Sequence, residues 1–490
     1  MEEFINSINK INISNVASRK ILSNETKKLL LKYQHEPTIK LINIVVDKYV
    51  ALISSETGTG KSYEASAICK ELKKRPLLIC PKTLMVGWKR IFDYFGIEPF
   101  DIVNYETIRN AKMYTNEHYT QRDNSTYISH NKNRRGNPDG YYYNWNLPRD
   151  TIIIFDEVHR CKEPSTANGR LLLSTRQLKE LKIPVILLSA TICERFEDMR
   201  IPFILFEFIP STRNYSEYIK LVCKKYKHLE PKKADYPDNK SYAIALENSR
   251  MLVIFNEIIN FTSRIRIKNL GDMFPVNQWG AHDFHIKKFY QISDNYKCIH
   301  KLIQKMKKNK SPSDHILPKI QKLKQKIELL KIPIFVDQAR SYLDEGKSVI
   351  IFVNYIATLD TISDLLSIKC KIQGNQNMEQ RQTSIDLFQS NIERIIICQI
   401  RAGGVGISLH DIHGNHPRVS LINYPDSASD LIQALGRAPR AGAKSAVIQK
   451  IICTANVEYE KNIMENINKK LANLSAINDG DLDQYKYIVE

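Results

Sequence analysis

Two stretches of the chain alternate short apolar runs with amphipathic segments of helical spacing. In the first, about residues 23–210, the apolar runs are Tyr49–Ile53, Leu77–Cys80, Ile152–Phe155 and Val185–Leu188. In the second, about residues 330–472, they are Ser348–Val353, Arg394–Cys398, Val419–Asn423 and Ala446–Ile452. Apolar strands separated by helices are typical of parallel sheets covered on both faces. The pattern predicts an α/β fold with two parallel-sheet domains.

The segment between these stretches, about residues 211–329, has a helical and strongly basic pattern. One helix face is indicated by the spacing of Ile316, Ile320, Leu323, Ile327 and Leu330. Lys319, Lys322, Lys324 and Lys326 lie on its other face, where they suit a solvated surface and a nucleic-acid contact equally well. We predict a basic helical insertion here, an N-terminal segment over residues 1–22 and a C-terminal tail over residues 473–490.

A smaller insertion, residues 116–148, combines basic and aromatic side chains. It contains Arg134-Arg135-Gly136, followed by Tyr141-Tyr142-Tyr143-Asn144-Trp145. Guanidinium groups beside aromatic rings can hold phosphates and stack on bases. A surface hairpin whose rings pack on their own domain explains the same pattern, and we favour that interpretation slightly.

Composition narrows the class of protein. Of 490 residues, 43% are hydrophobic and 26% charged, which excludes a disordered tail. The net charge of +19 favours a polyanionic partner, with nucleic acid the default. The 9 cysteines form no Cys-x-x-Cys pair, as expected for buried free thiols inside a cell. No apolar stretch approaches the ~18 residues that span a bilayer, so we expect an intracellular, soluble protein without a membrane partner.

The strongest chemical signal is the segment Ser55–Ser62, which directly follows an apolar run and precedes a helical pattern. Its glycines let backbone N–H groups wrap a phosphate chain. Lys61 can reach the β- and γ-phosphates, and the Ser62 hydroxyl can ligate Mg²⁺. Ser55 stands where the common pattern has its first glycine. The segment predicts a nucleoside triphosphate site.

A second signal is the acidic pair Asp156-Glu157, which ends the apolar run beginning at Ile152. Ligands of parallel α/β sheets bind at the carboxyl ends of the strands. Asp156 can hold Mg²⁺ through water, and Glu157 can orient and deprotonate an attacking water. Together with the phosphate loop, the pair predicts a nucleoside triphosphate hydrolase.

A third signal lies in the second stretch, where Gln433 precedes Arg437 and Arg440. Two arginines three residues apart share one face of a helical turn. An arginine supplied across a cleft stabilises phosphoryl transfer by about 10³–10⁵ in rate. Such arginines would couple hydrolysis to relative movement of the two domains.

Taken in order along the chain, these segments resemble the motifs of superfamily-2 helicase-type ATPases, closest to the Swi/Snf-type DNA translocases. Ser55–Ser62 resembles motif I and Asp156–His159 resembles motif II. Ser189–Thr191 resembles motif III and Gln433–Arg440 resembles motif VI. Cys80–Leu84, with Trp88, resembles motif Ia, and Asn104–Thr107 resembles the motif that follows it in the family. Ser348–Asn354 resembles motif IV, and Arg401–Leu409 resembles motif V. Tyr33-Gln34 resembles the adenine-reading glutamine element. The resemblance covers about residues 30–450 and implies two RecA-like domains around an ATP cleft.

The resemblance also implies residue roles. Catalysis falls to Lys61, Asp156, Glu157, Gln433, Arg437 and Arg440. ATP binding adds Gln34, Thr57, Gly58, Thr59, Gly60, Ser62 and Gly406, and Mg²⁺ would be held by Ser62 and Asp156. Coupling between nucleotide state and nucleic-acid grip falls to Ser189, Ala190 and Thr191. Contacts to the tracked strand are expected from Lys82, Thr83, Tyr105, Asn354, Arg401 and Gly404. Trp88 is expected in the core.

The function we predict is a nucleic-acid-stimulated ATPase that translocates along nucleic acid and remodels or unwinds it. Double-stranded DNA is favoured as the track, and partner proteins could supply targeting. An RNA helicase or transcript-release ATPase is the first alternative, and a nucleic-acid-binding scaffold without turnover is the second. Heavy use of Ile, Lys and Asn is typical of an AT-rich genome, such as a viral one. His410, His413 and His416 suggest a metal site, but a polar surface loop is the better interpretation.

Overall fold

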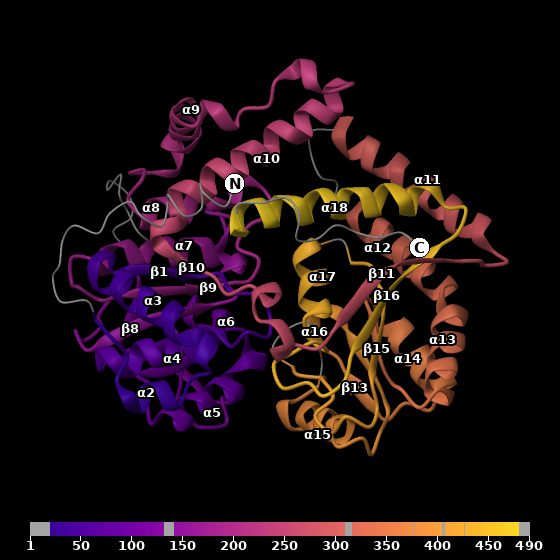
Figure 1. Ribbon diagram of the computed structural model, residues 1–490, viewed down its shortest axis with the longest axis horizontal. Coiled ribbons are helices and arrows are strands. Elements are labelled where there is room, and N and C mark those ends of the chain that lie inside the picture. Colours follow the sequence, from indigo (N-terminus) through magenta and orange to yellow (C-terminus); the bar gives the residue numbers. More distant parts are fainter. Residues whose placement is uncertain are drawn as a thin grey trace.

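The computed structural model describes residues 20–131, 142–308, 316–374, 376–403, 407–425 and 427–479. Two α/β domains lie side by side, each built on a parallel sheet of six strands (Figure 1). This arrangement confirms the predicted fold class. Within the described ranges, no helix is both long and apolar enough to span a bilayer. All nine cysteines lie within the described ranges and outside any disulfide, and seven of them are buried.

The first sheet defines domain 1. Its strand order is β10 (Thr262–Ser263), β1 (Val50–Ile53), β9 (Val185–Leu188), β8 (Thr151–Asp156), β2 (Arg75–Cys80) and β3 (Asp101–Asn104). Its covering helices include α3 (His35–Lys48), α4 (Lys61–Leu72), α5 (Met85–Phe95) and α7 (Ala167–Ser174). The register aligns Ile53 of β1 with Leu188 of β9, and Leu188 with Asp156 of β8. The segments that follow β1, β9 and β8 therefore leave one edge of the sheet together.

The second sheet defines domain 2. Its strand order is β11 (Asn277–Phe284), β16 (Val447–Thr454), β15 (Arg418–Asn423), β12 (Ser348–Val353), β14 (Ile395–Gln399) and β13 (Cys370–Ile372). Its helices include α13 (Ile332–Asp344), α14 (Ile356–Leu365), α15 (Met378–Gln389), α16 (Ile400–Gly403) and α17 (Ala428–Leu435). Alternate residues of β12 enter different hydrophobic clusters, and all six are buried. Burial on both faces explains why its strands are almost wholly apolar.

The segment predicted to be a helical insertion, residues 211–329, also supplies strands β10 and β11. Both are edge strands with polar residues, so neither has the apolar run that marks the central strands. Helices α9 (Tyr215–Lys225), α10 (Asn239–Ile258), α11 (Phe289–Lys308) and α12 (Ile316–Leu330) make up most of the rest. In α12 the isoleucines Ile316, Ile320 and Ile327 are buried, which confirms the predicted amphipathic helix.

In the smaller insertion, β6 (Ile128–His130) and β7 (Tyr143–Trp145) form an antiparallel pair. The Trp145 indole N–H donates to Ser174 Oγ at 2.8 Å, and the Tyr143 hydroxyl donates to the Arg109 carbonyl at 2.9 Å. Both rings are buried, so these two aromatic residues pack on their own domain as favoured. The predicted contacts of Arg134, Arg135 and Tyr141 lie outside the described residues.

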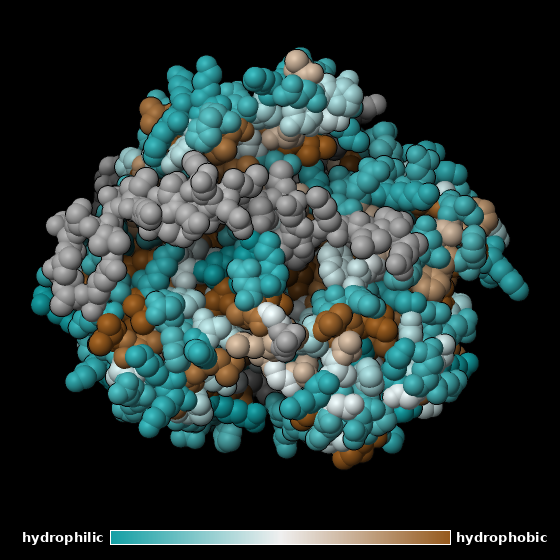
Figure 2. All heavy atoms as spheres, in the orientation of Figure 1, coloured by the Kyte–Doolittle hydropathy of each residue, from teal (hydrophilic) through white to brown (hydrophobic). Residues whose placement is uncertain are grey.

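The last helix of the described residues, α18 (Glu458–Asp479), lies across both domains, drawn in yellow in Figure 1. It continues beyond residue 472, where the sequence pattern suggested that a tail begins. On the face shown in Figure 2, hydrophilic residues cover most of both domains, and hydrophobic residues appear as separate patches.

Candidate active site

The loop between β1 and α4 is shaped by glycines. Gly58 and Gly60 have φ angles of +86° and +91°, a region that disfavours residues with a Cβ. Gly60 is the N-cap of α4, and no side chain caps the helix there. The Lys61 Nζ lies over the loop, 2.9 Å from the Ser55 carbonyl oxygen and 3.2 Å from that of Glu56. Burial lowers the Lys61 pKa, while Glu157 and Asp156 oppose that shift.

Gln34 and Tyr33 support this loop from outside the sheet. Gln34 Nε2 donates to the Thr59 carbonyl at 3.1 Å and to the Gly60 carbonyl at 3.2 Å. The Tyr33 hydroxyl also donates to the Thr59 carbonyl, at 3.1 Å. Both amide hydrogens of Gln34 therefore fix the conformation of the loop, with its side chain buried.

Asp156 and Glu157 stand at the end of β8. Asp156 accepts a hydrogen bond from the Trp88 indole N–H at 2.7 Å and from the Glu157 backbone N–H at 2.9 Å. Burial and the neighbouring charge of Glu157 raise the pKa of Asp156. Burial acts in the same direction on Glu157, but His159, Lys61 and Arg437 outweigh it and lower that pKa. Glu157 thus stays ionised and able to accept a proton.

His159 joins the acidic pair to the segment after β9. Its Nδ1 lies 3.3 Å from Glu157 Oε2 and 3.1 Å from Ser189 Oγ. Ser189 Oγ also accepts a hydrogen bond from the Thr191 backbone N–H at 3.1 Å. The predicted coupling residues Ser189, Ala190 and Thr191 are buried, and Ser189 is linked to Glu157 through His159.

Domain 2 completes the site with Gln433, Arg437 and Arg440. Gln433 Nε2 donates to Glu157 Oε2 at 3.2 Å, so the two domains meet at the predicted catalytic carboxylate. The guanidinium groups of both arginines donate to the Ile407 carbonyl, at 3.3 Å from Arg437 and 2.9 Å from Arg440. Burial lowers their pKa values to about 10 and about 9, which leaves both cationic at neutral pH.

The phosphate loop and the arginine segment are in close contact. A Cβ at Gly58 would lie 3.3 Å from Arg440 Cγ, and one at Gly436 would overlap the Thr57 hydroxyl. The domains are therefore closed on each other at this point.

The donor set fits Mg²⁺-ATP. Left-handed glycines and the uncapped start of α4 present backbone N–H groups for phosphates, with Lys61 beside them. Ser62 at that helix start and Asp156 would hold the metal, which when bound neutralises charge on the phosphate oxygens.

A groove crosses the two domains next to this site. It has a volume of about 460 Å³ and is lined by Lys82, Thr83, Arg122 and Arg160 of domain 1 and by Arg381, Gln399 and Arg401 of domain 2. A pocket of about 230 Å³ in domain 2 shares Gln399 and Arg401 with it and includes Asn354. Three of the residues predicted to contact nucleic acid, Lys82, Thr83 and Arg401, thus line one groove.

Two residues predicted to contact nucleic acid are engaged elsewhere. Tyr105 is 0% exposed, and its hydroxyl donates to the Asp156 carbonyl at 2.8 Å, so it supports the acidic pair and does not line the groove. The Asn354 amide donates to Glu328 at 2.9 Å and to the Tyr424 carbonyl at 3.2 Å. Gly404 and Gly406 lie outside the described residues. Trp88 is buried as predicted, but its hydrogen bond to Asp156 was not foreseen.

Glu194 is a contact that the sequence analysis missed. It follows the coupling segment of domain 1, and its Oε1 accepts hydrogen bonds from Ser427 Oγ, Ser429 N and Ser429 Oγ of domain 2, each at 3.0 Å. Lys470 lies 3.3 Å from the same carboxylate. Burial raises the pKa of Glu194, but the hydrogen bonds from Ser429 and the charge of Lys470 outweigh burial and lower that pKa to about 2. The one sequence signal for Glu194 was its position three residues after Thr191, the end of the predicted coupling segment.

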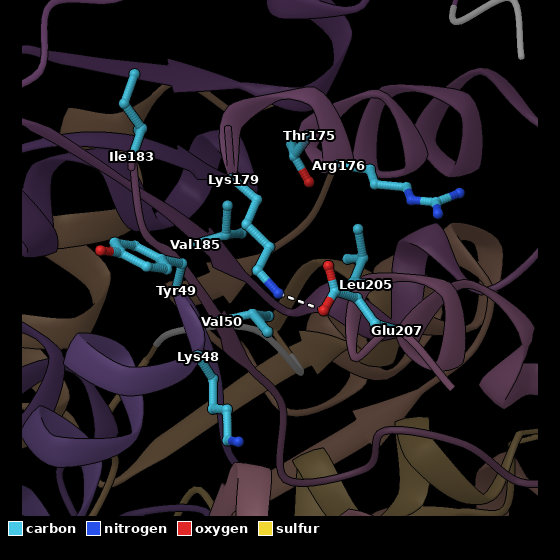
Figure 3. A pocket seen from close by; sticks show the side chains of 10 residues that line it. All are labelled: Lys48, Tyr49, Val50, Thr175, Arg176, Lys179, Ile183, Val185, Leu205 and Glu207. Carbon is cyan, nitrogen blue, oxygen red and sulfur yellow. Dashed lines mark ion pairs between the residues drawn. The ribbon is translucent and has the colours of Figure 1, made fainter. Parts of the chain in front are cut away.

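Two places outside the ATP site are a small cavity in domain 1 and the histidine loop of domain 2. A cavity of about 20 Å³ lies at the amino-terminal ends of β1 and β9, opposite the phosphate loop, where Lys179 and Glu207 form an ion pair (Figure 3). His416 Nδ1 lies 2.8 Å from the Gly346 carbonyl oxygen. Among the described residues, no group of three or more His, Cys, Asp or Glu is placed to hold a metal ion.

A phosphate loop and an acidic pair in one domain, met by arginines of a second parallel-sheet domain, define a two-domain ATPase of the helicase type. Residues 27–194 match the family model "Type III restriction enzyme, res subunit", and residues 327–442 match "Helicase conserved C-terminal domain". A putative ATP-dependent RNA helicase of Acanthamoeba polyphaga mimivirus is 53% identical over 485 residues, which are 98% of this chain and 89% of that protein. The chain belongs to this family of superfamily-2 helicases.

Two other similarities are weaker, one in extent and one in identity. A DNA repair and recombination protein of Gallus gallus is 31% identical over 137 residues, 26% of this chain and 14% of that protein. The structure of S. cerevisiae Dbp5 bound to RNA and ADP BeF3 has a TM-score of 0.46 at 13% identity, over 92% of both chains. The two family models and the relative that is 53% identical make the chain a helicase-type, nucleic-acid-dependent ATPase. The narrower resemblance to Swi/Snf-type DNA translocases is not confirmed.

Proposed function

We propose that this protein is an ATP-dependent RNA helicase whose ATPase is stimulated by RNA. The ATPase part of the proposal is carried by the contact of Gln433 with Glu157, which joins the two halves of the site at 3.2 Å. RNA takes the place of the duplex DNA predicted from the motifs, because the relative that is 53% identical over nearly the whole chain is named an RNA helicase.

The residues divide the hydrolytic work between the domains. Lys61 and the loop around Gly58 and Gly60 bind the phosphates, and Ser62 and Asp156 would hold Mg²⁺. Glu157 orients the attacking water and accepts its proton. Arg437 and Arg440 stabilise the charge that develops during transfer, and Gln433 keeps Glu157 in place.

RNA is proposed to lie in the groove lined by Lys82, Thr83 and Arg401. A strand held there touches both domains, so it favours the closed arrangement that completes the ATP site. Contacts from lysine, arginine and hydroxyl side chains mainly address phosphate and sugar, which makes binding dependent on salt and tolerant of sequence.

The experiment is steady-state ATPase activity without nucleic acid and with RNA, single-stranded DNA or duplex DNA. We expect the largest stimulation with RNA and its loss in Glu157→Gln. Stimulation by duplex DNA alone would contradict the proposal and favour translocation on DNA, the second candidate, which the partial similarity to a DNA repair protein supports. Hydrolysis that survives Lys61→Ala would contradict the assigned site itself.

A further inference from the structure

Helix α18 is anchored in domain 2 by a buried ion pair near its start. Lys331 Nζ lies 2.9 Å from Glu460 Oε1, with side-chain exposures of 0% and 1%. Glu460 Oε2 also accepts a hydrogen bond from the Thr454 backbone N–H at 2.7 Å, at the end of β16. The first turn of α18 is thus fixed to the second sheet.

The other end of α18 is fixed in domain 1. Asp479, its last residue, has a fully buried side chain that pairs with two arginines, Arg264 and Arg266. Arg264 Nη2 donates to Asp479 Oδ2 at 2.9 Å, and Arg266 Nε lies 3.2 Å from Oδ1. The 22-residue helix therefore bridges the domains, as Figure 1 shows.

Arg264 connects this end of α18 to the phosphate loop. Its guanidinium donates to the Ser54 carbonyl and lies 3.5 Å from Glu56 Oε1. The backbone beside it, residues 263–267, runs along the same loop. Ser54 N donates to the Ser263 carbonyl, Glu56 N to the Ile265 carbonyl and Ile267 N to Glu56 Oε2, each at 3.0 Å.

The unusual Ser55 belongs to this network. Its hydroxyl accepts a hydrogen bond from the Ile265 backbone N–H at 3.1 Å and donates to Glu64 Oε2, also at 3.1 Å. A glycine, which the common pattern has here, would provide neither bond. The departure from the pattern ties the phosphate loop to the segment that Arg264 holds.

Helix α18 also contacts the coupling segment. Asn478 Nδ2 donates to the Ala190 carbonyl at 3.2 Å, and Asn473 Nδ2 donates to the Glu194 carbonyl at 3.2 Å. One helix of domain 2 therefore touches both the coupling segment and, through Arg264, the loop that would bind phosphates.

We propose that Asp479 and Arg264 are positioning residues of the ATP site, through which α18 holds the phosphate loop in its binding conformation when the domains are closed. The proposal rests on the ATP site assigned under the proposed function. Removing the Asp479 charge leaves Arg264 buried without its main counter-ion, so the guanidinium and the Ser54–Glu56 backbone must rearrange. We therefore expect ATP affinity to fall more than the rate of the chemical step.

The test compares Asp479→Asn with Lys469→Ala in the full-length chain. Lys469 also forms an ion pair from α18, to Glu247 of α10 at 2.8 Å, but this pair is partly exposed and lies away from the phosphate loop. KM for ATP, kcat, and the Kd of a fluorescent ATP analogue are measured with melting temperatures. We expect Asp479→Asn to raise KM and Kd about tenfold, from the loss of a hydrogen bond to a charged group. Its kcat at saturating ATP should stay within about twofold, and Lys469→Ala should leave KM unchanged.

Asp479→Glu, which keeps the charge, should recover most of the ATP affinity. Arg264→Lys, which loses the planar guanidinium with its paired N–H donors, should raise KM for ATP as Asp479→Asn does. If Asp479→Asn does not fold, Arg264→Lys takes its place in the test. Wild-type KM in both Asp479→Asn and Arg264→Lys would overturn the proposal, as would an equal rise in KM for Lys469→Ala. Failure of the ATP site is recognised separately, because Lys61→Ala would then retain hydrolysis.

Discussion

The two domains share one architecture but contribute to the ATP site in different ways. In domain 1 the site residues follow three neighbouring strands, β1, β9 and β8, whose ends are aligned in the sheet. In domain 2 they come from α17 and the turn after it, and they reach the site only where the domains touch. In the mechanism we propose, the binding groups are built into one sheet, whereas the groups that complete catalysis depend on closure.

The largest expected effect comes from the domain 2 side. Arg437→Ala should lower kcat about 10³–10⁵-fold, because the charge of the transition state loses its cationic partner. Arg437→Lys keeps a charge without the planar fork and should recover only part of the rate. Steady-state kinetics with melting curves checks this, and a wild-type kcat in Arg437→Ala would show that Arg437 takes no part in the chemistry.

On the domain 1 side, Glu157→Gln should lower kcat about 10²–10⁴-fold, the range for loss of a general base. The amide keeps the shape of the side chain and its contact with Gln433. ATP affinity should therefore change little, which equilibrium binding of a fluorescent ATP analogue measures. Retained turnover would assign the proton to another group.

Glu194 tests the contact between the domains outside the ATP site. Glu194→Gln should reduce RNA stimulation on the order of tenfold while basal hydrolysis remains, since it weakens closure without touching nucleotide groups. A loss of basal activity equal to the loss of stimulation would contradict a role in coupling.

The same contact has a pH signature. The pKa of Glu194 is lowered from its ordinary 4.5 to about 2 in the folded chain. Its contribution to stability is therefore present above pH 4.5 and is lost as pH falls toward 2. The difference in unfolding free energy between wild type and Glu194→Gln should shrink over that range. A difference that stays constant would show that the charge is not what stabilises the contact.

The smallest effect is expected in the groove that spans the domains. Arg401→Ala should weaken RNA binding several-fold and reduce the slope of log K against log salt by about 1. Lys48→Ala, an exposed charge at the opposite edge of domain 1, is the matched control and should change neither. Equal effects of the two substitutions would mean that general charge, and not the groove, binds RNA.

Much of the fold and site could be predicted because their signals are local. Buried strands such as Val185–Leu188 are short apolar runs, and the phosphate loop and acidic pair directly follow such strands. Edge strands β10 and β11 carry polar residues and pair with distant strands, so neither composition nor period marks them.

The missed contacts are distant in sequence. Glu194 meets Ser429 across 235 residues, and Arg264 meets Asp479 across 215. Tyr105 has the polar handle of a binding residue, but the sheet buries it beneath Asp156. Only the folded arrangement distinguishes a tyrosine that supports a site from one that contacts a ligand.

The central claim is that domain 1 binds ATP and domain 2 completes its hydrolysis. The most direct measurement compares Lys61→Ala with Arg440→Ala, by the Kd of a fluorescent ATP analogue and the single-turnover hydrolysis rate with RNA. Lys61→Ala should lose ATP affinity, whereas Arg440→Ala should bind ATP nearly as the wild type does and hydrolyse it far more slowly. Wild-type hydrolysis by Arg440→Ala would contradict the account.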